Sequence, residues 1–209
     1  GGPGFRRRRV QWCCLGCVAT LLPWAVGALG GGAPGYFGWV VDDALMRTTG
    51  IFQSIPSFRF AILVVAILSP SIESVIIAIA IVSWPPMARL VRGEFQALRN
   101  REFVQACISM GMSDLRVIAL HILPNCLSSI IVTGSLLVAT AILTESALSF
   151  LGLSDPNVMS WGVMVGAARA SRPRPWGLSP IPGGALLSTV TAVTRVGRGP
   201  HDARHPARP

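Results

Sequence analysis

The sequence predicts an all-α protein, a polytopic transmembrane helical bundle, and composition, hydropathy and length support this prediction. Of the 209 residues, 51% are hydrophobic and only 13% are charged. The mean hydropathy of +0.57 lies outside the usual range of soluble globular domains. A spanning helix needs roughly 20 largely apolar residues, so this length allows one membrane domain of about four to five spans.

Apolar stretches mark the predicted helices. They are residues 10–29, 51–68, 72–84 and 118 to about 150, with a weaker fifth stretch at 177–196. Only Ser69, Pro70 and Ser71 separate the second stretch from the third. Because a turn this short joins two apolar runs, the sequence predicts an antiparallel helical hairpin here.

The basic residues do not indicate a nucleic-acid binder, although the formal net charge is +9. They neither form one stripe nor alternate with aromatic residues that could stack on bases. All 18 are arginines, four at residues 6–9 and seven from Arg169 to the end of the chain. The expected surroundings are therefore membrane lipid, with no nucleic-acid partner.

No catalytic, cofactor or metal site is predicted. Cys13, Cys14 and Cys17 have a C-x-x-C spacing, which could bind a metal or form a disulfide, but no second ligand pair follows and small packing residues are the favoured interpretation. The histidines have no zinc-binding spacing, and no G-x-x-x-x-G-K-[ST] loop is present. An intramembrane enzyme would need paired catalytic groups, which the sequence lacks. The chain is not expected to be an enzyme.

A polar segment between Pro85 and Pro124 carries five arginines against Glu94, Glu102 and Asp114. A membrane-flanking loop with an arginine excess belongs in the cytoplasm by the positive-inside rule. The turn at residues 69–71 and the end of the long apolar stretch near Phe150 are then expected on the outside.

This loop is predicted to contain two short helices. Asn100 is the expected N-cap of the first helix. Its apolar stripe would consist of Phe103, Ala106, Cys107 and Met110. Gly111 can end it in a left-handed conformation, and Ser113 can cap a second helix with Asp114 in its first turn. The two helices, hinged at Gly111, would continue into a long membrane helix and offer a shape that a soluble partner can grip.

The run REFVQACISMGMSDLRVIALHILPN, residues 101–125, resembles the cytoplasmic EAA loop of binding-protein-dependent ABC importer permeases. The family pattern is E-A-A, three residues, G, and then I-x-L-P after about nine more residues. The positions that match at this spacing are Ala106, Gly111, Leu123 and Pro124. Gln105 stands where glutamate is usual, Cys107 replaces the second alanine, and His121 replaces the isoleucine, although H-I-L-P-N is common in the peptide-importer branch.

Further motifs resemble the dipeptide, oligopeptide and nickel subgroup of the same family. They are ESALSFLGL at 145–153 followed by Ser160-Trp161-Gly162, GYFGWVVDDALMR at 35–47, and VSWPPMARLVRGE at 82–94. The resemblance covers about residues 35–170.

The resemblance implies a permease subunit of a bacterial inner-membrane importer, forming the pathway for dipeptides, oligopeptides or nickel. It implies pairing with a second permease as a heterodimer, two cytoplasmic ATP-binding subunits and an extracytoplasmic solute-binding protein. ATP hydrolysis would belong to another chain, and substrate would pass between the two permeases by alternating access.

The EAA loop, about residues 87–124, would dock in a cleft of an ATP-binding subunit and relay its closure to the membrane helices. The residues assigned to this coupling are Glu102, Gln105, Ala106, Cys107, Gly111, Ser113, Asp114, Leu123 and Pro124. Because Gln105 lacks the usual charge, weaker docking is expected, with Glu102 one turn earlier as a substitute. The alternative is an ordinary connection whose glycine and proline only punctuate helices.

Two ionisable residues within apolar stretches are candidate pathway or interface residues. Arg59 is expected to face the pathway or a partner subunit rather than lipid. Glu145 lies about 22 residues beyond Leu123, or roughly 33 Å along a helix, near the outer interface. There it is either a solvated carboxylate, the favoured interpretation, or a ligand for a peptide amine.

The two ends depart from the family, which normally has six helices. The predicted topology places residues 1–9 outside, where four arginines contradict the positive-inside rule. Residues 171–209 are rich in proline, glycine and arginine and lack the apolar final helix of the family. One hypothesis is that residues 1–34 and 171–209 are translated out of frame around a permease domain at 35–170. The alternative function is a non-functional truncated or frameshifted remnant.

Overall fold

The computed structural model describes residues 25–27, 30–32, 34–38, 40–155, 158–170 and 180–204. All regular structure within these ranges is helical, which confirms the all-α prediction. The arginines at 6–9 and the cysteines at 13, 14 and 17 lie outside the described residues, so the interpretations placed on them stay predictions.

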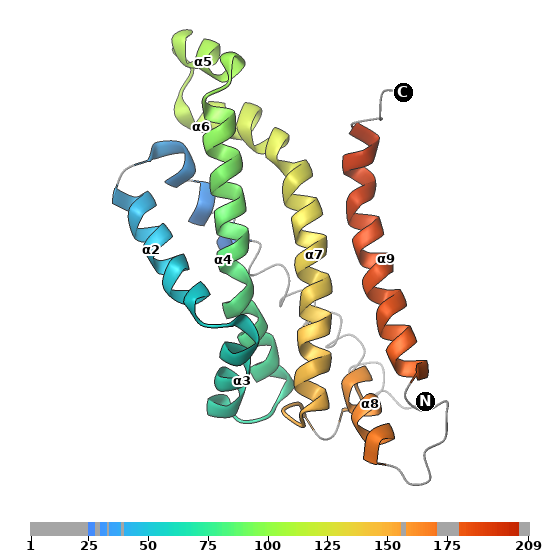
Figure 1. The fold of residues 1–209 in the computed structure, drawn as a ribbon. Coiled ribbons are helices and arrows are strands. Elements are labelled where there is room, and N and C mark those ends of the chain that lie inside the picture. Colours follow the sequence, from blue (N-terminus) through green and yellow to red (C-terminus); the bar gives the residue numbers. More distant parts are fainter. Residues whose placement is uncertain are drawn as a thin grey trace, which may run out of the picture.

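Figure 1 shows the helices as a bundle in which α4, α7 and α9 run alongside one another, with α5 and α6 at one end and α8 at the other. The elements are α2 (Val40–Ser54), α3 (Ser57–Leu68), α4 (Ile72–Arg99), α5 (Glu102–Ser109), α6 (Asp114–Val117), the π-helical turn η1 (Ile118–Ile122), α7 (Leu123–Phe150), α8 (Trp161–Ala170) and α9 (Pro180–Arg204).

Two of the described helices are long and apolar enough to cross a membrane. They are α4 and the continuous helix Asp114–Phe150 that joins α6, η1 and α7. The pair α2 and α3 makes a third span if the two helices count as one. The predicted transmembrane bundle is therefore supported, while the total of four to five spans stays a prediction.

The apolar run at 51–68 is divided between two helices, which corrects the prediction of a single helix. α2 ends at Ser54, α3 begins at Ser57, and the two are bent by 83°. Pro56 explains the break, because a proline lacks an N–H and disfavours the helical conformation in the residue before it. The hairpin between α3 and α4 is as predicted, with Ser71 Oγ accepting a hydrogen bond from Ser74 N (3.2 Å).

The third predicted helix does not end at Trp84. α4 continues through Pro85 and Pro86 to Arg99, so the polar connection begins at Asn100. The prolines remove backbone hydrogen bonds from α4. Burial of neighbouring side chains offsets this loss, because Pro85, Met87 and Val91 are all completely buried.

Buried side chains form two clusters at different heights of the bundle. The cluster nearer α5 and α6 contains Tyr36, Met87, Val91, Phe95, Val104, Cys107, Val117, Ile122, Cys126 and Ile130. The other contains Ala61, Val65, Val75, Ala78, Ile79 and Leu148. The first cluster joins the connection between α4 and α7 to the body of the bundle.

Glycines let the helical segment before α2 lie directly on α4. A Cβ at Gly27 would lie 2.7 Å from Met87 Cβ, one at Gly35 would lie 2.9 Å from the Arg92 carbonyl oxygen, and one at Gly31 would collide with the Ala88 carbonyl oxygen. All three glycines therefore lie against α4, as small residues do in close helix pairs of membrane proteins.

Where the sequence predicts that the apolar final helix of the family is missing, the structure contains a helix, α9 (Pro180–Arg204). α9 spans 25 residues and packs along α7. It begins with Pro180 and Pro182, which the first turn tolerates because its N–H groups have no partner within the helix. α9 is not among the described helices that are apolar enough to cross a membrane.

Candidate functional site

The candidate site is the connection between α4 and α7, residues 100–122, called the α4–α7 loop below. Gly111 separates α5 from α6 with φ of +80°, which confirms its predicted left-handed conformation. The N–H groups of Gly111 and Met112 donate to the carbonyl oxygens of Ile108 (2.9 Å) and Cys107 (3.2 Å). These bonds close the end of α5 and fix the turn, because only glycine adopts this φ at little cost.

The start of α5 differs by one residue from the prediction. Arg101 occupies the N-cap position, and its carbonyl oxygen accepts from the N–H groups of Val104 (3.0 Å) and Gln105 (3.1 Å). Asn100, the predicted N-cap, instead ends α4 with φ of −86° and ψ of 1°. An N-cap residue has an extended backbone, so Asn100 cannot serve α5 in this conformation.

The second short helix starts where the sequence predicts. Ser113 is the N-cap residue of α6 and Asp114 lies in its first turn. The Ser113 carbonyl oxygen accepts from Arg116 N (2.9 Å) and Val117 N (3.0 Å), but its side chain makes no capping bond. α6 then runs without interruption into η1 and α7.

The residues of the apolar stripe predicted for α5 do not all face the same way. Val104 and Cys107 face the bundle and are buried, whereas Phe103, Ala106 and Met110 are exposed. Since α5 has only eight residues, two side chains three positions apart suffice to anchor it. The large apolar side chains that the loop exposes are Phe103, Ile108, Met110, Leu115 and Leu120, of which Met110 and Leu115 are 74% and 78% exposed.

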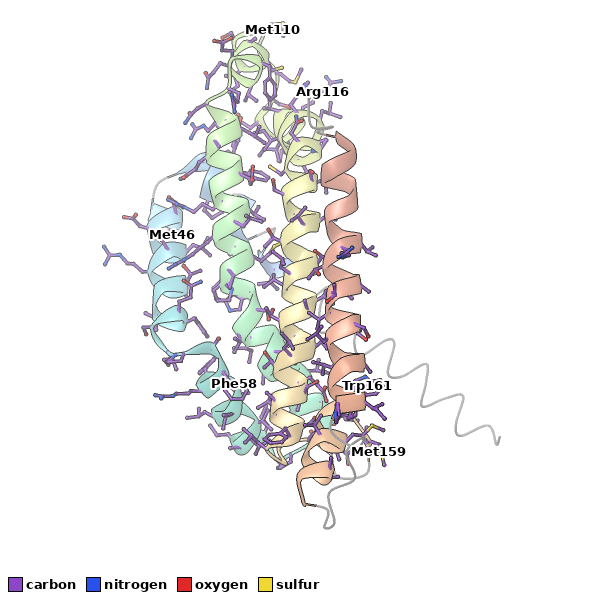
Figure 2. All side chains as sticks on the ribbon, turned by 45° about the vertical axis from the view of Figure 1, so that its right-hand side comes forward. Met46, Phe58, Met110, Arg116, Met159 and Trp161 are labelled. Carbon is purple, nitrogen blue, oxygen red and sulfur yellow. The ribbon has the colours of Figure 1, made fainter. Side chains whose placement is uncertain are left out.

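Charged residues surround these apolar side chains. Arg99, Arg101 and Arg116 are exposed, as are Glu102 in the first turn of α5 and Asp114. Figure 2 shows Met110 and Arg116 at the same end of the bundle, far from Met159 and Trp161 at the other end. This end of the described bundle thus presents both exposed apolar side chains and positive charge.

Gln105 holds the beginning of α5 against the end of α4. Its Nε2 donates to the Arg99 carbonyl oxygen at 2.9 Å, one of the carbonyls that a helix end leaves without an internal partner. A glutamate at this position could not donate this bond. The departure from the family pattern at Gln105 therefore has a structural role within the loop.

Leu123 and Pro124 lie at the junction of η1 and α7, with the proline in the first turn of α7. Pro124 has no N–H to donate into the preceding turn, and the π-helical turn directly precedes it. Asn125 Nδ2 donates to the His121 carbonyl oxygen at 2.6 Å, which supplies a partner at this irregular point.

Sequence reasoning missed Tyr36, which connects the α4–α7 loop to the segment before α2. Its hydroxyl donates to Asp114 Oδ1 at 2.7 Å, and the Arg99 guanidinium lies 5.4 Å from its ring centre. Burial, followed by the hydrogen bond and the charge of Asp114, raises the pKa of Tyr36 to about 12, against an opposing effect of Arg99. Tyr36 belongs to the GYFG motif, but no local pattern relates it to a residue 78 positions away.

Arg89, Arg92 and Arg99 belong to α4 rather than to the loop, so Arg101 and Arg116 are the loop arginines. Arg92 forms a two-bond ion pair with Asp42 of α2, through Nε to Oδ1 and through Nη2 to Oδ2 (2.5 Å). Arg89 Nε donates to Thr49 Oγ1 at 3.2 Å. Arg92 and Arg89 thus fasten α2 to α4.

The structure keeps Arg59 and Glu145 apart from the α4–α7 loop. Arg59 is exposed near the start of α3. Glu145 is half-buried near the far end of α7 and accepts hydrogen bonds from Ser149 Oγ (2.7 Å) and Ser146 Oγ (3.5 Å). α8 packs closely there, because a Cβ at Gly162 would collide with the Ser146 carbonyl oxygen.

A pocket of about 350 Å³ lies where the α2–α3 bend meets the prolines of α4. It is lined by Phe52, Gln53, Ile55, Pro56, Ser57, Phe60, Val82, Pro85 and Pro86. The Phe52 ring packs edge to face against Phe60 (5.9 Å) and Trp84 (5.5 Å). The break between α2 and α3 and the proline pair of α4 thus line one pocket, and broken helices of this kind are found at the binding sites of transporters.

Residues 25–195 match the family described as the binding-protein-dependent transport system inner membrane component. The chain belongs to this family. The match extends beyond residues 35–170 on both sides. Membership in this transport family also agrees with the expectation that the chain is not an enzyme by itself.

Relatives of the chain confirm the resemblance to the peptide branch of this permease family. The chain is 37% identical over 194 residues to the oligopeptide transport system permease protein OppC of Bacillus subtilis, covering 92% of this chain and 63% of that one. It is 41% identical over 174 residues to the dipeptide transport system permease protein DppC of Alkalihalophilus pseudofirmus (82% and 57%). It is 38% identical over 193 residues to the glutathione transport system permease protein GsiD of Escherichia coli (91% and 63%). The chain thus spans 57–63% of the length of these relatives.

A solved structure supports the fold of this family member. A chain of the MetNI methionine ABC transporter, in an inward-facing conformation, matches with a TM-score of 0.71, covering 93% of this chain and 92% of that one. The sequences are 18% identical, so this likeness concerns the fold.

Proposed function

We propose that the chain is the permease subunit of an ABC importer and forms part of a transmembrane pathway for short peptides. The relatives named above transport oligopeptides, dipeptides and glutathione, which favours peptides over nickel as the substrate. The chain would sit in the inner membrane as a multi-pass protein. A second permease subunit, two cytoplasmic ATP-binding subunits and an extracytoplasmic solute-binding protein would complete the assembly.

The observation that carries the proposal is the two-sided construction of the α4–α7 loop. Val104, Cys107 and Val117 anchor its inner side in the bundle. Its outer side presents exposed apolar side chains, with Met110 and Leu115 exposed most fully, among arginines. Apolar anchors within a charged rim are the usual composition of a protein-binding surface. The loop thus has one side for the bundle and one for an ATP-binding subunit.

The connection of the loop to the membrane helices supports mechanical coupling. α6, η1 and α7 form one continuous helix of 37 residues, which reaches from the loop to Glu145 and α8 at the opposite end. α4 leads directly into the other end of the loop, and its Val91 and Phe95 side chains are buried in the bundle. A displacement of α5 and α6 by an ATP-binding subunit would therefore move two spanning helices together.

The pathway would be formed with the second permease, because this chain leaves large apolar faces uncovered. Ile51 of α2 and Ile67 of α3 are 69% and 72% exposed. In this proposal one such face meets the second permease and the others meet lipid. Arg59 is assigned to the pathway or to that subunit interface, since an unpaired charge is costly against lipid. Glu145 is assigned to the outer interface.

The experiment that tests the proposal measures uptake and assembly together. Cells whose own peptide permease is replaced by this chain would be supplied with labelled dipeptide or with nickel, and the ATP-binding subunit would be purified with the tagged permease. We expect dipeptide uptake and co-purification. Absence of uptake for both substrates, together with absence of co-purification, contradicts the proposal and would favour a non-functional remnant.

Two methionines provide a matched pair of variants for this experiment. Met110 and Met159 are both 74% exposed and lie at opposite ends of the bundle (Figure 2). Met110→Asp should abolish co-purification of the ATP-binding subunit, because a carboxylate then interrupts an apolar contact. Met159→Asp should leave co-purification unchanged. Equal effects of the two substitutions would show that the loop is not the docking surface.

A further inference from the structure

Tyr36 lies where three parts of the molecule meet. Its hydroxyl donates to Asp114 in the first turn of α6, the guanidinium of Arg99 at the end of α4 faces its ring, and α2 begins four residues further along the chain. The side chain is only 3% exposed and packs in the same cluster as Phe95 and Val104. Tyr36 therefore packs against the side of the loop that faces the bundle.

The bond to Asp114 is one that a buried tyrosine needs. A buried phenol requires a hydrogen-bond partner, and a carboxylate is a strong acceptor. Because the pKa of Tyr36 is raised to about 12, the hydroxyl keeps its proton near neutral pH and remains a donor. The Tyr36 hydroxyl is therefore the donor in the bond to Asp114 Oδ1.

The segment that carries Tyr36 is fastened to α2 and α4. Gly38 N donates to the Pro34 carbonyl oxygen at 2.9 Å, which closes the turn that leads into α2. Gly35 lies against the backbone of Arg92, and the side chain of Arg92 holds Asp42 in the first turn of α2. Because of these contacts, a displacement of Tyr36 would also displace the first turn of α2.

We propose that Tyr36 is a positioning residue that transmits movement of the α4–α7 loop to α2. The covalent chain already joins the loop to α4 and α7. Tyr36 adds a third route, through Asp114 and the turn at Gly38, to the helix that ends at the 83° bend. A loop displaced by an ATP-binding subunit would then carry the start of α2 with it and shift α2 relative to α3 at Ile55 and Pro56. The inference rests on the proposed docking of the loop.

The test uses the complete transporter in proteoliposomes and measures peptide transported per ATP hydrolysed. Tyr36→Phe keeps the buried ring and removes the hydroxyl. Asp114→Ala removes the acceptor from an exposed residue, so a failure of either variant to fold leaves the other. We expect Tyr36→Phe, which alters a buried residue, to retain the ATP-binding subunit. Both variants, compared per bound ATP-binding subunit, should lose about fivefold or more in the ratio of transport to hydrolysis, the scale of a typical coupling between sites.

Conservative and unrelated variants complete the test. Asp114→Asn keeps an oxygen acceptor for the tyrosine, so its ratio of transport to hydrolysis should be higher than that of Asp114→Ala, which loses the same charge. Thr140→Val removes an exposed hydroxyl that bonds only to Leu137 of its own helix, and should change nothing. The inference is overturned if Tyr36→Phe and Asp114→Ala couple as the unaltered protein does, or if their loss equals the loss of bound ATP-binding subunit. Failure of the unaltered transporter to take up peptide would instead refute the proposed function.

Discussion

Asp42 and Arg92 join α2 to α4 through two parallel hydrogen bonds, with Nη2 to Oδ2 at 2.5 Å. Their side chains are only 12% and 26% exposed, so the pair is largely removed from solvent. The fork of an arginine matches both oxygens of a carboxylate. This contact sets where α2 begins on α4, just after the turn that follows Tyr36 in the chain.

Removing one partner of the Asp42–Arg92 pair should destabilise the protein measurably. We expect Asp42→Ala to cost about 2 kcal/mol, below the roughly 3–5 kcal/mol of breaking a fully buried pair, because Arg92 can still reach solvent. Arg92→Lys keeps the charge but not the fork and should be intermediate. The measurement is the melting temperature in detergent. The double variant Asp42→Ala with Arg92→Ala should melt above Asp42→Ala alone, since it leaves no unpaired charge; a lower value would contradict the assignment.

Restoring the family's glutamate should strengthen docking while weakening the loop itself. In Gln105→Glu the side chain loses its bond to the Arg99 carbonyl oxygen, at a cost of about 1 kcal/mol, but gains a charge on the exposed side of α5. We expect the affinity for the ATP-binding subunit to rise by up to about fivefold, the limit for an exposed charge contact.

Salt dependence and a neutral variant check this interpretation of Gln105. The gain of Gln105→Glu should disappear at high salt, because exposed charges are screened. Gln105→Ala also loses the amide but adds no charge, so it should bind no better than the unaltered protein. If Gln105→Glu and Gln105→Ala bind equally, the position takes no charged part in docking.

Local chemistry allowed much of the α4–α7 loop to be predicted. Gly111 is left-handed because it must close α5, and Ser113 with Asp114 begins α6 as capping rules require. The error at Asn100 arose because the end of α4 was placed too early, at Pro85. A proline pair often indicates a helix end. Here the helix continues because Met87 and Val91 pack against residues far away in the sequence, and no local sequence pattern indicates that packing.

The contacts that matter most for coupling could not be predicted from sequence. Tyr36 and Asp114 are 78 residues apart, and Asp42 and Arg92 are 50 apart, so each pair is created only when the helices assemble. Hydropathy likewise treated residues 51–68 as one run, although Pro56 was a local signal for the break. For Phe103 and Met110 the helical period correctly indicated an apolar side but could not tell whether the bundle or a partner covers it.

The glycines before α2 should be intolerant of even one methyl group. In Gly31→Ala the added Cβ meets the Ala88 carbonyl oxygen, a backbone atom that cannot rotate away, so α4 and this segment must separate. We expect a loss of about 2 kcal/mol, typical of overpacking. Gly93→Ala is the matched control, because a Cβ there meets nothing within 4 Å, and alanine should even stabilise α4 by up to about 1 kcal/mol. Thermal unfolding in detergent compares the two, and equal melting temperatures would show that residues 25–38 do not pack on α4.

Arg59 should affect transport without affecting the ATP-binding subunit. It is exposed near the start of α3, between Ser57 and Phe60, which line the pocket at the α2–α3 bend. Figure 1 shows α3 at the end of the bundle opposite α5 and α6. We expect Arg59→Glu to lower peptide uptake by about tenfold, equivalent to about 1.4 kcal/mol, because reversing the charge changes the field along the pathway or at the second permease. Arg59→Lys, which keeps the charge, should retain most of the uptake.

Co-purification of the second permease distinguishes the two possible positions of Arg59. If Arg59→Glu no longer co-purifies with the second permease, Arg59 lies at the subunit interface. If the second permease still co-purifies while uptake is reduced, Arg59 lies in the pathway. Full uptake by Arg59→Glu would contradict both.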